Sequence, residues 1–538
     1  MIAENICTVY EAFEACARKY PARPVLNVLP GTAEVYAIEP GEITYGDALS
    51  DINALATAFQ TAGYTAGMRV ALLLENRPEF FINWLALNKI GASVVPVNPD
   101  LRVSELEYLI GHSEPALIIA IETRHRELNE AVKTAGITLP VVTSSTVIPP
   151  PRSDSVVGRL QSRDVREAAI LYTSGTTGKP KGCILSNTYF LLAGRWYSEV
   201  GGIATLHEDG ERMITPLPVF HMNAMAYSFM AMIAVGGCLT VLDRFHPRSW
   251  WSDVSVAKAT CLHYLGIMPT LLMGFHVSAD DRAHRVRFGF GAGVDPKLQV
   301  EFEERFGFPL VEAWAMTETG AGAVIAASTQ KRLIAQASIG KPESTVECNV
   351  IDDDGMPASQ GELLVRRTGD NPRHGFFTEY YKDSKATEEA WADGWFHTGD
   401  IVRKDADGNF YFVDRKKNVI RRSGENISAV EVESVLMRHP DVLAAGVAAV
   451  PDPVRGDEVF ACLKVSNPSE EKATAITAWC LEKMAYFKAP GYIAFVDELP
   501  LTATQKIQRS TLKDLVGSLL VDSNTVVTAH LKKRQSCE

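Results

Sequence analysis

The N-terminal part of the chain alternates short apolar runs with amphipathic segments. Residues 8–18 and 45–62 carry apolar side chains at helical spacing. The apolar run that begins at Val70 and the run 93–97 suit buried strands, and residues 79–90 between them have helical spacing. This strand–helix–strand order predicts a parallel sheet that is covered by helices.

The same pattern then repeats. Ser104 and Glu107 have the spacing of a capping box, ahead of a helix that we expect to end near Gly111, and residues 116–120 are the next predicted strand. Residues 142–164 are rich in proline and serine, which is typical of a surface connection. The sequence therefore predicts an α/β N-terminal domain of parallel-rich sheets layered with helices.

The C-terminal part has its own pattern. Residues 429–438 read as a helix, and residues 443–450 and 459–465 read as strands. Because 538 residues are too many for one ordinary core, we expect a large domain and a smaller one. We place the large domain at 1–415 and a small α+β domain at 416–538.

Composition narrows the class of protein. Hydrophobic residues make up 46% and charged residues 22%, which is ordinary for a globular protein. The formal net charge of -12 argues against nucleic-acid binding, which needs a basic face. No apolar run approaches the length of a membrane span.

The cysteines and the N-terminus bear on location. The nine cysteines are scattered and include no Cys-x-x-Cys pair, which fits unpaired thiols in a reducing cytosol better than disulfides or a zinc site. The first residues lack a basic start followed by a long apolar segment, so no signal peptide is expected. We therefore expect a cytoplasmic protein.

The strongest chemical signal is the stretch 173–182, Thr-Ser-Gly-Thr-Thr-Gly-Lys-Pro-Lys-Gly, which follows the apolar run 168–171. Its glycines let backbone N–H groups approach phosphate oxygens, and Lys179 and Lys181 add positive charge. It is not a Walker A loop, because Pro180 follows the first lysine. A flexible surface linker is the alternative that composition alone allows.

This stretch resembles the phosphate loop of the adenylate-forming superfamily, which includes acyl-CoA synthetases, peptide-synthetase adenylation domains and luciferases. The resemblance extends over nearly the whole chain. It implies that the loop binds the phosphates of ATP and that Lys181 takes part in catalysis. The nucleotide-binding residues implied in this loop are Thr173, Ser174, Gly175, Thr176, Thr177, Gly178 and Lys179.

Three further motifs complete the nucleotide site implied by the resemblance. Residues 311–320 resemble a Tyr-Gly-x-Thr-Glu motif, in which Thr317 contacts the α-phosphate and Glu318 binds Mg²⁺. Asp400 matches an aspartate that accepts hydrogen bonds from both ribose hydroxyls, and Arg415 matches a further nucleotide contact. The chain departs from the motif at Trp314 and Ala315, where relatives carry tyrosine and glycine, which bears on the pocket wall and on substrate identity.

The acyl pocket is implied by two other segments. Residues 214–240 place Phe220 and His221 between a strand and an apolar helix, and residues 288–294 alternate glycine with larger residues. From spacing alone, a packed histidine and a tight strand end explain these residues as well as a binding site does. The resemblance implies an acyl pocket of Phe220, His221, Met222, Gly291, Ala292, Gly293 and Trp314.

The small domain is expected to be mobile. By resemblance, Lys417 is its hinge, and Lys506 enters the active site during adenylation to neutralise charge. The loop that contains Ser423, Gly424 and Glu425 resembles the lining of the thiol tunnel on the CoA side. The two features lie on different faces of this domain in the family, so rotation would exchange them. Gln505 replaces the glycine that relatives carry before the lysine.

The resemblance implies an ATP-dependent acid–thiol ligase that uses Mg²⁺, forms an acyl-AMP with release of pyrophosphate, and transfers the acyl group to CoA. Residues 218–223, 245–251 and 332–340 look closest to the carnitine/crotonobetaine-CoA ligase branch. Aromatic residues near the pocket suit a carnitine- or betaine-like acid by cation–π contact, or equally any compact or aryl acid. The alternatives are loading of a carrier protein or other acceptor, and a catalytically weak nucleotide-binding relative. The oligomeric state, monomer or homodimer, stays open.

Overall fold

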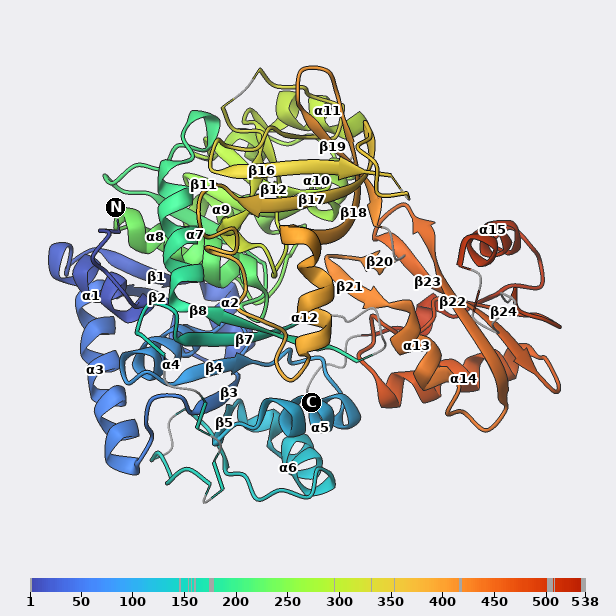
Figure 1. Ribbon diagram of the computed structural model, residues 1–538, viewed down its shortest axis with the longest axis horizontal. Coiled ribbons are helices and arrows are strands. Elements are labelled where there is room, and N and C mark those ends of the chain that lie inside the picture. The colour runs from blue at the N-terminus through green and yellow to red at the C-terminus, as the bar shows by residue number, and fades with distance from the viewer. Residues whose placement is uncertain are drawn as a thin grey trace.

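The apolar runs of the N-terminal part form the strands of two sheets, as the sequence pattern predicts (Figure 1). The computed structural model describes residues 2–144, 147–152, 154–155, 157–158, 161–173, 179–294, 296–329, 331–352, 354–415, 419–500, 507 and 509–533. The strands of one sheet are β1 (Pro24–Val28), β2 (Gly41–Thr44), β9 (Arg212–Thr215), β10 (Cys238–Val241), β11 (Cys261–Leu265), β12 (Phe288–Ala292), β13 (Leu310–Trp314) and β14 (Ile325–Ala326). Those of the other are β3 (Arg69–Leu73), β4 (Ser93–Pro96), β5 (Leu117–Ala120), β6 (Val141–Val142), β7 (Glu167–Thr173) and β8 (Lys181–Ser186).

Both sheets are parallel except at their ends. The first has the strand order β14-β13-β12-β11-β9-β10-β1-β2, and its antiparallel pairs are β13–β14 and β1–β2. The second has the order β6-β5-β3-β4-β7-β8, and its antiparallel pair is β7–β8. The predicted class, α/β with parallel-rich sheets, is confirmed. The antiparallel β7–β8 pair matters for function, because the phosphate loop connects these two strands.

Helices pack against these sheets and share their apolar core. They are α1 (Val9–Lys19), α2 (Pro30–Tyr36), α3 (Tyr45–Ala62), α4 (Pro78–Lys89), α5 (Val103–Ser113), α6 (His125–Thr134), α7 (Asn187–Glu199), α8 (Met230–Val235), α9 (Trp250–Val256), α10 (Ile267–Met273) and α11 (Pro296–Phe306). One core cluster contains Leu72 of β3, Trp84 of α4 and Val311 of β13, so it joins the two sheets through the helices. The helices expected near 8–18, 45–62 and 79–90 are confirmed within one residue at each end.

Two local expectations differ from the structure. Ser104 does not cap α5: the helix begins after Arg102, whose backbone N–H is accepted by the Glu105 carboxylate at 3.0 Å. Ser104 lies inside the helix and donates its hydroxyl to the Lys483 carbonyl at 2.8 Å. The apolar helix expected after His221 begins as a π-helix, η3 (Asn223–Phe229), and continues as α8. Such π-turns occur mostly at functional sites.

A third sheet was not expected from the sequence. Its strands are β15 (Ser338–Gly340), β16 (Val346–Ile351), β17 (Gln360–Arg367), β18 (Phe396–Lys404) and β19 (Phe410–Arg415), in the order β15-β19-β18-β17-β16. All its pairs are antiparallel. Helix α12 (Ser384–Ala390) lies between this sheet and β7–β8 in Figure 1.

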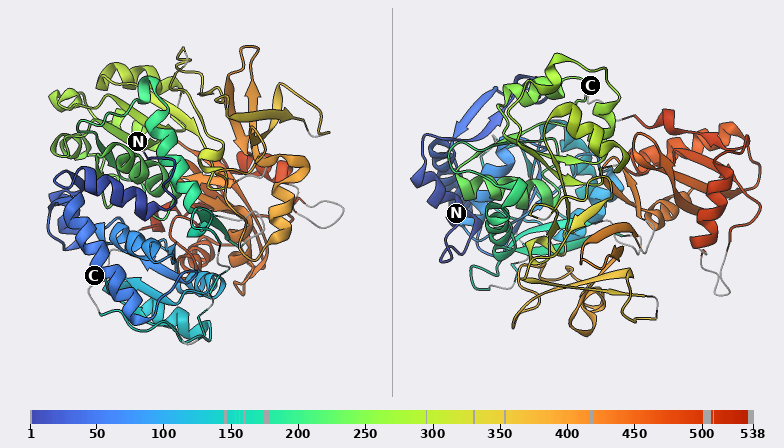
Figure 2. Two further views of the ribbon diagram at one scale, coloured as in Figure 1. Left: turned by 60° about the vertical axis from the view of Figure 1, so that its left-hand side comes forward. Right: turned by 90° about the horizontal axis from the view of Figure 1, so that it is seen from above.

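The small domain follows β19 and forms a separate body at one end of the molecule, which the right-hand view of Figure 2 shows clearly. Its strands are β20 (Val419–Arg422), β21 (Glu425–Ser428), β22 (Val442–Asp452), β23 (Gly456–Val465), β24 (Tyr492–Phe495) and β25 (Val526–Val527). Its helices are α13 (Ala429–Leu436), α14 (Glu470–Lys483) and α15 (Arg509–Leu519). The boundary at 415/416 stays a prediction, because residues 416–418 lie outside the described part of the chain.

The small domain docks on α5 through a buried ion cluster. Lys488 Nζ lies 2.6 Å from Glu105 Oε1 of the large domain and 2.7 Å from Glu431 Oε1 of the small domain. The Ala485 backbone N–H donates to the second Glu105 oxygen at 3.0 Å. Burial alone would lower the pKa of Lys488, but the two carboxylates raise it above the usual value. The lysine therefore stays charged and holds the domains together.

Among the described residues, no helix combines the length and the hydropathy that crossing a membrane would need.

A second buried lysine should make the stability of the protein depend on pH. Lys532 contacts Glu458, which Arg422 also contacts at 2.8 Å, and burial next to Arg422 lowers the pKa of Lys532 to about 7. Between that value and the unfolded value of about 10.4, only the unfolded chain binds this proton, so stability should rise with pH across this window.

We expect Lys532→Met to remove this rise, as measured by urea denaturation from pH 7 to pH 9.5. Lys385→Met removes a lysine whose side chain is 87% exposed and should leave the rise intact. An unchanged pH slope in Lys532→Met would contradict the shifted pKa.

Candidate active site

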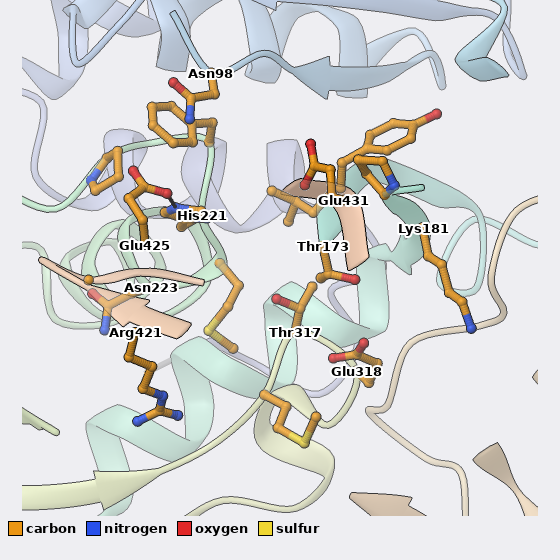
Figure 3. Close-up of a pocket in the computed structure, with 18 of the residues that line it drawn as sticks. Asn98, Thr173, Lys181, His221, Asn223, Thr317, Glu318, Arg421, Glu425 and Glu431 are labelled. Atoms are coloured by element: carbon orange, nitrogen blue, oxygen red, sulfur yellow. Dashed lines mark ion pairs between the residues drawn. The ribbon is translucent and has the colours of Figure 1, made fainter. Parts of the chain in front are cut away.

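A cavity of about 1770 Å³ opens where the two domains meet (Figure 3). It is lined by residues from β7–β8, from the turn before η3, from the ends of β11, β12 and β13, and from the small domain. In Figure 3, Thr173, Thr317 and Glu318 lie on one side of it, and His221, Asn223 and Glu425 lie on the other. The predicted residues that line it are Thr173, Lys179, Lys181, Phe220, His221, Met222, Gly291, Ala292, Gly293, Thr317, Glu318, Gly424 and Glu425.

The two ends of the phosphate loop are fixed by strand pairing. Thr173 at the end of β7 lies opposite Lys181 at the start of β8, so the residues between them connect a tight antiparallel pair. Ser174, Gly175, Thr176, Thr177 and Gly178 lie outside the described residues.

Both lysines of the loop lie over aromatic rings. Lys181 Nζ is 4.6 Å from the ring centre of Tyr380, and Lys179 Nζ is 5.3 Å from that of Tyr108. The Tyr108 hydroxyl donates to the Pro180 carbonyl at 3.0 Å. The rings thus keep two positive charges at the cavity wall, where an anionic phosphate chain would be stabilised.

Glu318 is the acidic residue best placed for a metal. It is 7% exposed, lines the cavity, and its Oε1 accepts the Tyr380 hydroxyl at 2.9 Å. Among the described residues, no three His, Cys, Asp or Glu side chains gather as a metal cage. This donor set suits Mg²⁺, which is commonly held by one or two carboxylates together with substrate phosphates and water. Thr317 beside it is held by its carbonyl, which accepts the Tyr189 hydroxyl at 2.9 Å.

Trp314 and Asp400 form a pair that the sequence did not predict. The Trp314 indole N–H donates to Asp400 Oδ2 at 2.8 Å, and the two residues are 5% and 1% exposed. The structure thus differs from the expectation that Trp314 lines the acyl pocket: its neighbours Ala313, Ala315 and Met316 face the cavity instead. Asp400 lies just behind the wall, next to Thr398 and Gly399, which do line it. Asp400 is opposite Arg415 in the β18–β19 ladder, which brings those two backbones together.

The apolar end of the cavity depends on close backbone packing. A Cβ on Gly266 would lie 1.7 Å from the Gly293 carbonyl oxygen, and one on Gly291 would lie 2.2 Å from the Tyr264 carbonyl oxygen. Gly293 also has a φ of +82°, which side chains rarely adopt. Only glycine allows these strand ends to meet, and the resulting slot is open to a flat or narrow group.

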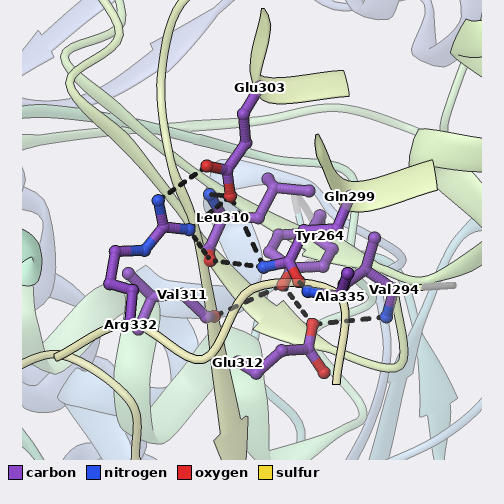
Figure 4. A network of polar contacts seen from close by, with 9 residues as sticks. All are labelled: Tyr264, Val294, Gln299, Glu303, Leu310, Val311, Glu312, Arg332 and Ala335. Atoms are coloured by element: carbon purple, nitrogen blue, oxygen red, sulfur yellow. Dashed lines mark hydrogen bonds and ion pairs between the residues drawn. The ribbon is translucent and has the colours of Figure 1, made fainter. Parts of the chain in front are cut away.

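A buried carboxylate holds this turn in place (Figure 4). Glu312 accepts the backbone N–H groups of Gly293 at 2.8 Å and Val294 at 3.2 Å, and also the Tyr264 hydroxyl. Burial raises the pKa of Glu312. In the same network, Arg332 pairs with Glu303 and donates to the Leu310 carbonyl, so this arginine supports the fold rather than the cavity wall.

The small domain inserts its CoA-side loop into the cavity. Glu425 Oε2 lies 3.5 Å from His221 Nε2, across the domain interface. A Cβ on Gly424 would lie 2.3 Å from Leu265 Cδ1, so this glycine allows the loop to pack against the end of β11. Ser423 has a φ of +50° and turns the chain into that loop. Lys417 and Lys506 lie outside the described residues, and their roles stay predictions.

Two residues that line the cavity, Asn223 and Tyr380, were not predicted from the sequence as binding residues. Asn223 directly follows the segment 220–222 and lines the cavity from the first turn of η3. Tyr380 contacts Glu318 from a loop more than sixty residues further along the chain. The adjacency of Asn223 to His221 could have indicated it, whereas nothing in the local sequence marks Tyr380.

Comparison with known proteins identifies this site. Residues 13–377 match the AMP-binding enzyme family, and residues 431–506 match the AMP-binding enzyme C-terminal domain. The chain belongs to the AMP-binding enzyme family. The crotonobetaine/carnitine–CoA ligase of Shigella flexneri is 31% identical over 486 residues, which cover 87% of this chain and 93% of that protein. The ligase of the same name from Escherichia coli O45:K1 (strain S88 / ExPEC) is 32% identical over 487 residues, with the same coverage.

Solved structures confirm the fold of this AMP-binding enzyme. An o-succinylbenzoate CoA synthetase from Bacillus subtilis has a TM-score of 0.78 at 23% identity and covers 94% of this chain and 98% of its own. An amide bond synthetase from Marinactinospora thermotolerans has a TM-score of 0.79 at 22% identity and covers 94% and 99%. The expected superfamily, its carnitine/crotonobetaine branch and the AMP-forming acyl-CoA synthetase class are confirmed by the family match and the curated relatives.

Removal of the Tyr380 hydroxyl tests whether Glu318 binds a metal. Tyr380→Phe takes this donor from the Glu318 carboxylate, so we expect the Mg²⁺ concentration for half-maximal rate to rise about ten- to a hundredfold. Pyrophosphate release over a Mg²⁺ titration measures this. Tyr381→Phe is the matched control, because the Tyr381 hydroxyl donates to Glu114 instead, at 2.6 Å. Equal Mg²⁺ dependence in the two variants would contradict the role of Tyr380.

Proposed function

We propose that this chain activates a small or medium carboxylic acid with ATP and transfers the acyl group to CoA. The observation that carries the proposal is the shared cavity. The ends of the phosphate loop, Glu318, an apolar slot and the CoA-side loop of the second domain all line it. These are the parts that a nucleotide, an acid and a thiol need at one place.

The chemistry follows from the poor reactivity of a carboxylate, whose leaving group would be oxide. A carboxylate oxygen attacks the α-phosphorus of ATP, and the bond to the bridging oxygen breaks, so that pyrophosphate leaves. The thiol of CoA then attacks the acyl carbon and AMP leaves, with the thiol proton released. Lys179 and Lys181 would bind and orient the phosphates, and Thr317 would contact the α-phosphate. Asp400 is our candidate for the ribose, which would have to reach it past Thr398 and Gly399 in the cavity wall. Mg²⁺, held at Glu318, would neutralise phosphate charge during the first step.

The orientation of the small domain supports the second step. Glu425 lies next to His221 at the cavity, and the contacts of Lys488 with Glu105 and Glu431 hold it there. We therefore assign this arrangement to thioester formation. For adenylation, the domain would rotate near Lys417 to bring Lys506 into the cavity.

The identity of the carboxylic acid is the second part of the proposal. The curated relatives act on crotonobetaine and carnitine by name. The rings of Phe220, Tyr227 and Phe290 line the cavity and suit either a quaternary ammonium or an aryl or compact acid. A cytoplasmic location fits the unbonded state of the described cysteines.

The function is tested by pyrophosphate release over a panel of carboxylic acids, with and without CoA. We expect release that depends on both the acid and CoA. Release that needs no CoA and leaves a stable adenylate would instead indicate loading of another acceptor. Absence of pyrophosphate release with every acid would indicate a protein that binds a nucleotide but activates no acid of the panel.

Replacement of Lys506 should separate the two half-reactions. Lys506→Ala removes the positive charge proposed for adenylation, so we expect pyrophosphate release to fall by about a hundredfold or more. Thioester formation from a supplied acyl-adenylate should persist, because the CoA-side loop is untouched. Lys385→Ala, at an exposed lysine, is the control. Equal loss of both half-reactions would contradict the assignment.

A further inference from the structure

A fully buried histidine lies behind the acyl end of the cavity. His263 of β11 is 0% exposed, and burial lowers its pKa to about 3, so the ring is neutral. Its Nε2 lies 2.9 Å from the Tyr197 hydroxyl of α7. Its Nδ1 lies 2.7 Å from Asn223 Oδ1 and 2.9 Å from Ser228 Oγ, both in η3.

The buried hydroxyl of Tyr197 fixes the direction of these hydrogen bonds. His263 is the hydrogen-bond partner found for that hydroxyl among the described residues, so the hydroxyl must donate to Nε2 or keep its proton unpaired. The histidine proton is then on Nδ1, which donates to Asn223 Oδ1. Ser228 Oγ lies 3.3 Å from the same oxygen and donates to it as well.

The His263 donor decides which way the Asn223 amide points. A flipped amide would place its NH₂ group against the His263 Nδ1–H, whereas the Ser228 hydroxyl can rotate to donate or to accept. Asn223 lines the cavity and is half-buried, and no described residue accepts a hydrogen bond from its Nδ2. A fixed pair of N–H donors therefore faces the acyl end of the cavity.

The wall around this donor carries both apolar and charged side chains. Phe220 and Met222 precede Asn223, and Tyr264 and Phe290 line the same cavity from β11 and β12. The Tyr264 hydroxyl is already bonded to Glu312. Glu425 and Arg421 lie on the same side of the cavity as Asn223 (Figure 3), so both signs of charge are present there.

We propose that Asn223 is a specificity-determining residue, and that its amide donates to an oxygen on the substrate beyond the reacting carboxylate, such as a keto, hydroxyl or ether oxygen. The inference rests on the proposed acid activation and narrows its substrate class to oxygen-bearing acids. A trimethylammonium group has no acceptor for these N–H groups and would leave them unpaired beside a positive charge. The Asn223 donor thus disfavours a quaternary ammonium at this wall.

The test uses matched acids that differ only in one oxygen. The pairs are 4-oxopentanoate with 4-methylpentanoate, 4-hydroxybutanoate with pentanoate, and 3-(4-hydroxyphenyl)propanoate with 3-(4-methylphenyl)propanoate. CoA-dependent pyrophosphate release gives kcat/KM for each acid. In at least one pair, we expect the oxygen-bearing acid to be favoured about three- to tenfold, the worth of one hydrogen bond.

Variants assign this preference to the asparagine. Asn223→Leu keeps the side-chain size and should reduce the ratio to about one or below, mainly by lowering kcat/KM of the oxygen-bearing acid. Asn223→Asp presents only acceptors, so it should lose the keto preference while the hydroxy acids, which can donate, keep theirs. Tyr197→Phe touches no cavity atom but frees the His263 tautomer, and it should reduce the preference in part. Asn129→Leu on the exposed face of α6 is the control for the same change of side chain.

The outcomes distinguish this inference from the proposed function. Turnover without an oxygen preference in any pair, or a preference that survives Asn223→Leu, overturns the role of Asn223 and leaves acid activation standing. Absence of pyrophosphate release with every acid overturns the proposed function, and the inference with it. Loss of the preference in Asn223→Leu, with retained turnover of the hydrocarbon acids, supports both.

Discussion

The contact of one buried lysine with two carboxylates sets the geometry of the whole site. Lys488 lies between Glu105 of the large domain and Glu431 of its own domain, at 2.6 and 2.7 Å. Loss of one partner of a buried pair typically costs about 3–5 kcal/mol, because the other charge stays buried without compensation. That cost applies when one partner is removed and the others stay buried. If the domains separate, all three charged groups return to water, so the cluster fixes this orientation without making separation of the domains impossible.

The Lys488 contacts hold the small domain where its loop 423–425 reaches the cavity. Gly424 has a φ of +87°, which favours glycine, and it packs beside Leu265, while Glu425 lies 3.5 Å from His221. The opposite wall is built by the same means: Gly266 and Gly293 allow two strand ends to meet, and Glu312 bonds the turn between them. The glycines thus shape the cavity because they have no side chains, and buried polar groups such as Glu312 hold its walls in place. The Tyr197–His263–Asn223 chain extends this arrangement, since its members fix one another's proton positions before any substrate binds.

Much of the fold was predictable, because it follows from local patterns. The apolar run after Gly67 forms strand β3, and the segment 79–90 forms helix α4, as their spacing predicts. Their order along the chain predicts the parallel pairing of β3 with β4. The antiparallel sheet β15–β19 was missed because it pairs its first strand, β15, with its last, β19, and no local pattern shows a pairing between strands so far apart in the chain. The cap of α5 was misplaced because Ser104 and Glu107 fit the capping-box rule, whereas the helix begins after Arg102, whose side chain cannot accept a hydrogen bond and whose backbone N–H donates to Glu105. Ser104 donates its hydroxyl to the Lys483 carbonyl of the small domain instead of capping the helix.

The sequence by itself determined the chemistry. The stretch 173–182, Thr317–Glu318 and the terminal motif around Lys506 are local motifs, and the predicted phosphate and metal contacts come from their backbone and charge alone. Only the tertiary structure decided which groups line the cavity. It turned Trp314 away from the cavity to Asp400, brought Tyr380 to Glu318, and aimed the Asn223 amide by a histidine forty residues away in the chain. The reason is physical: a hydrogen-bond direction depends on partners in space, and a single sequence does not show which distant residues become neighbours.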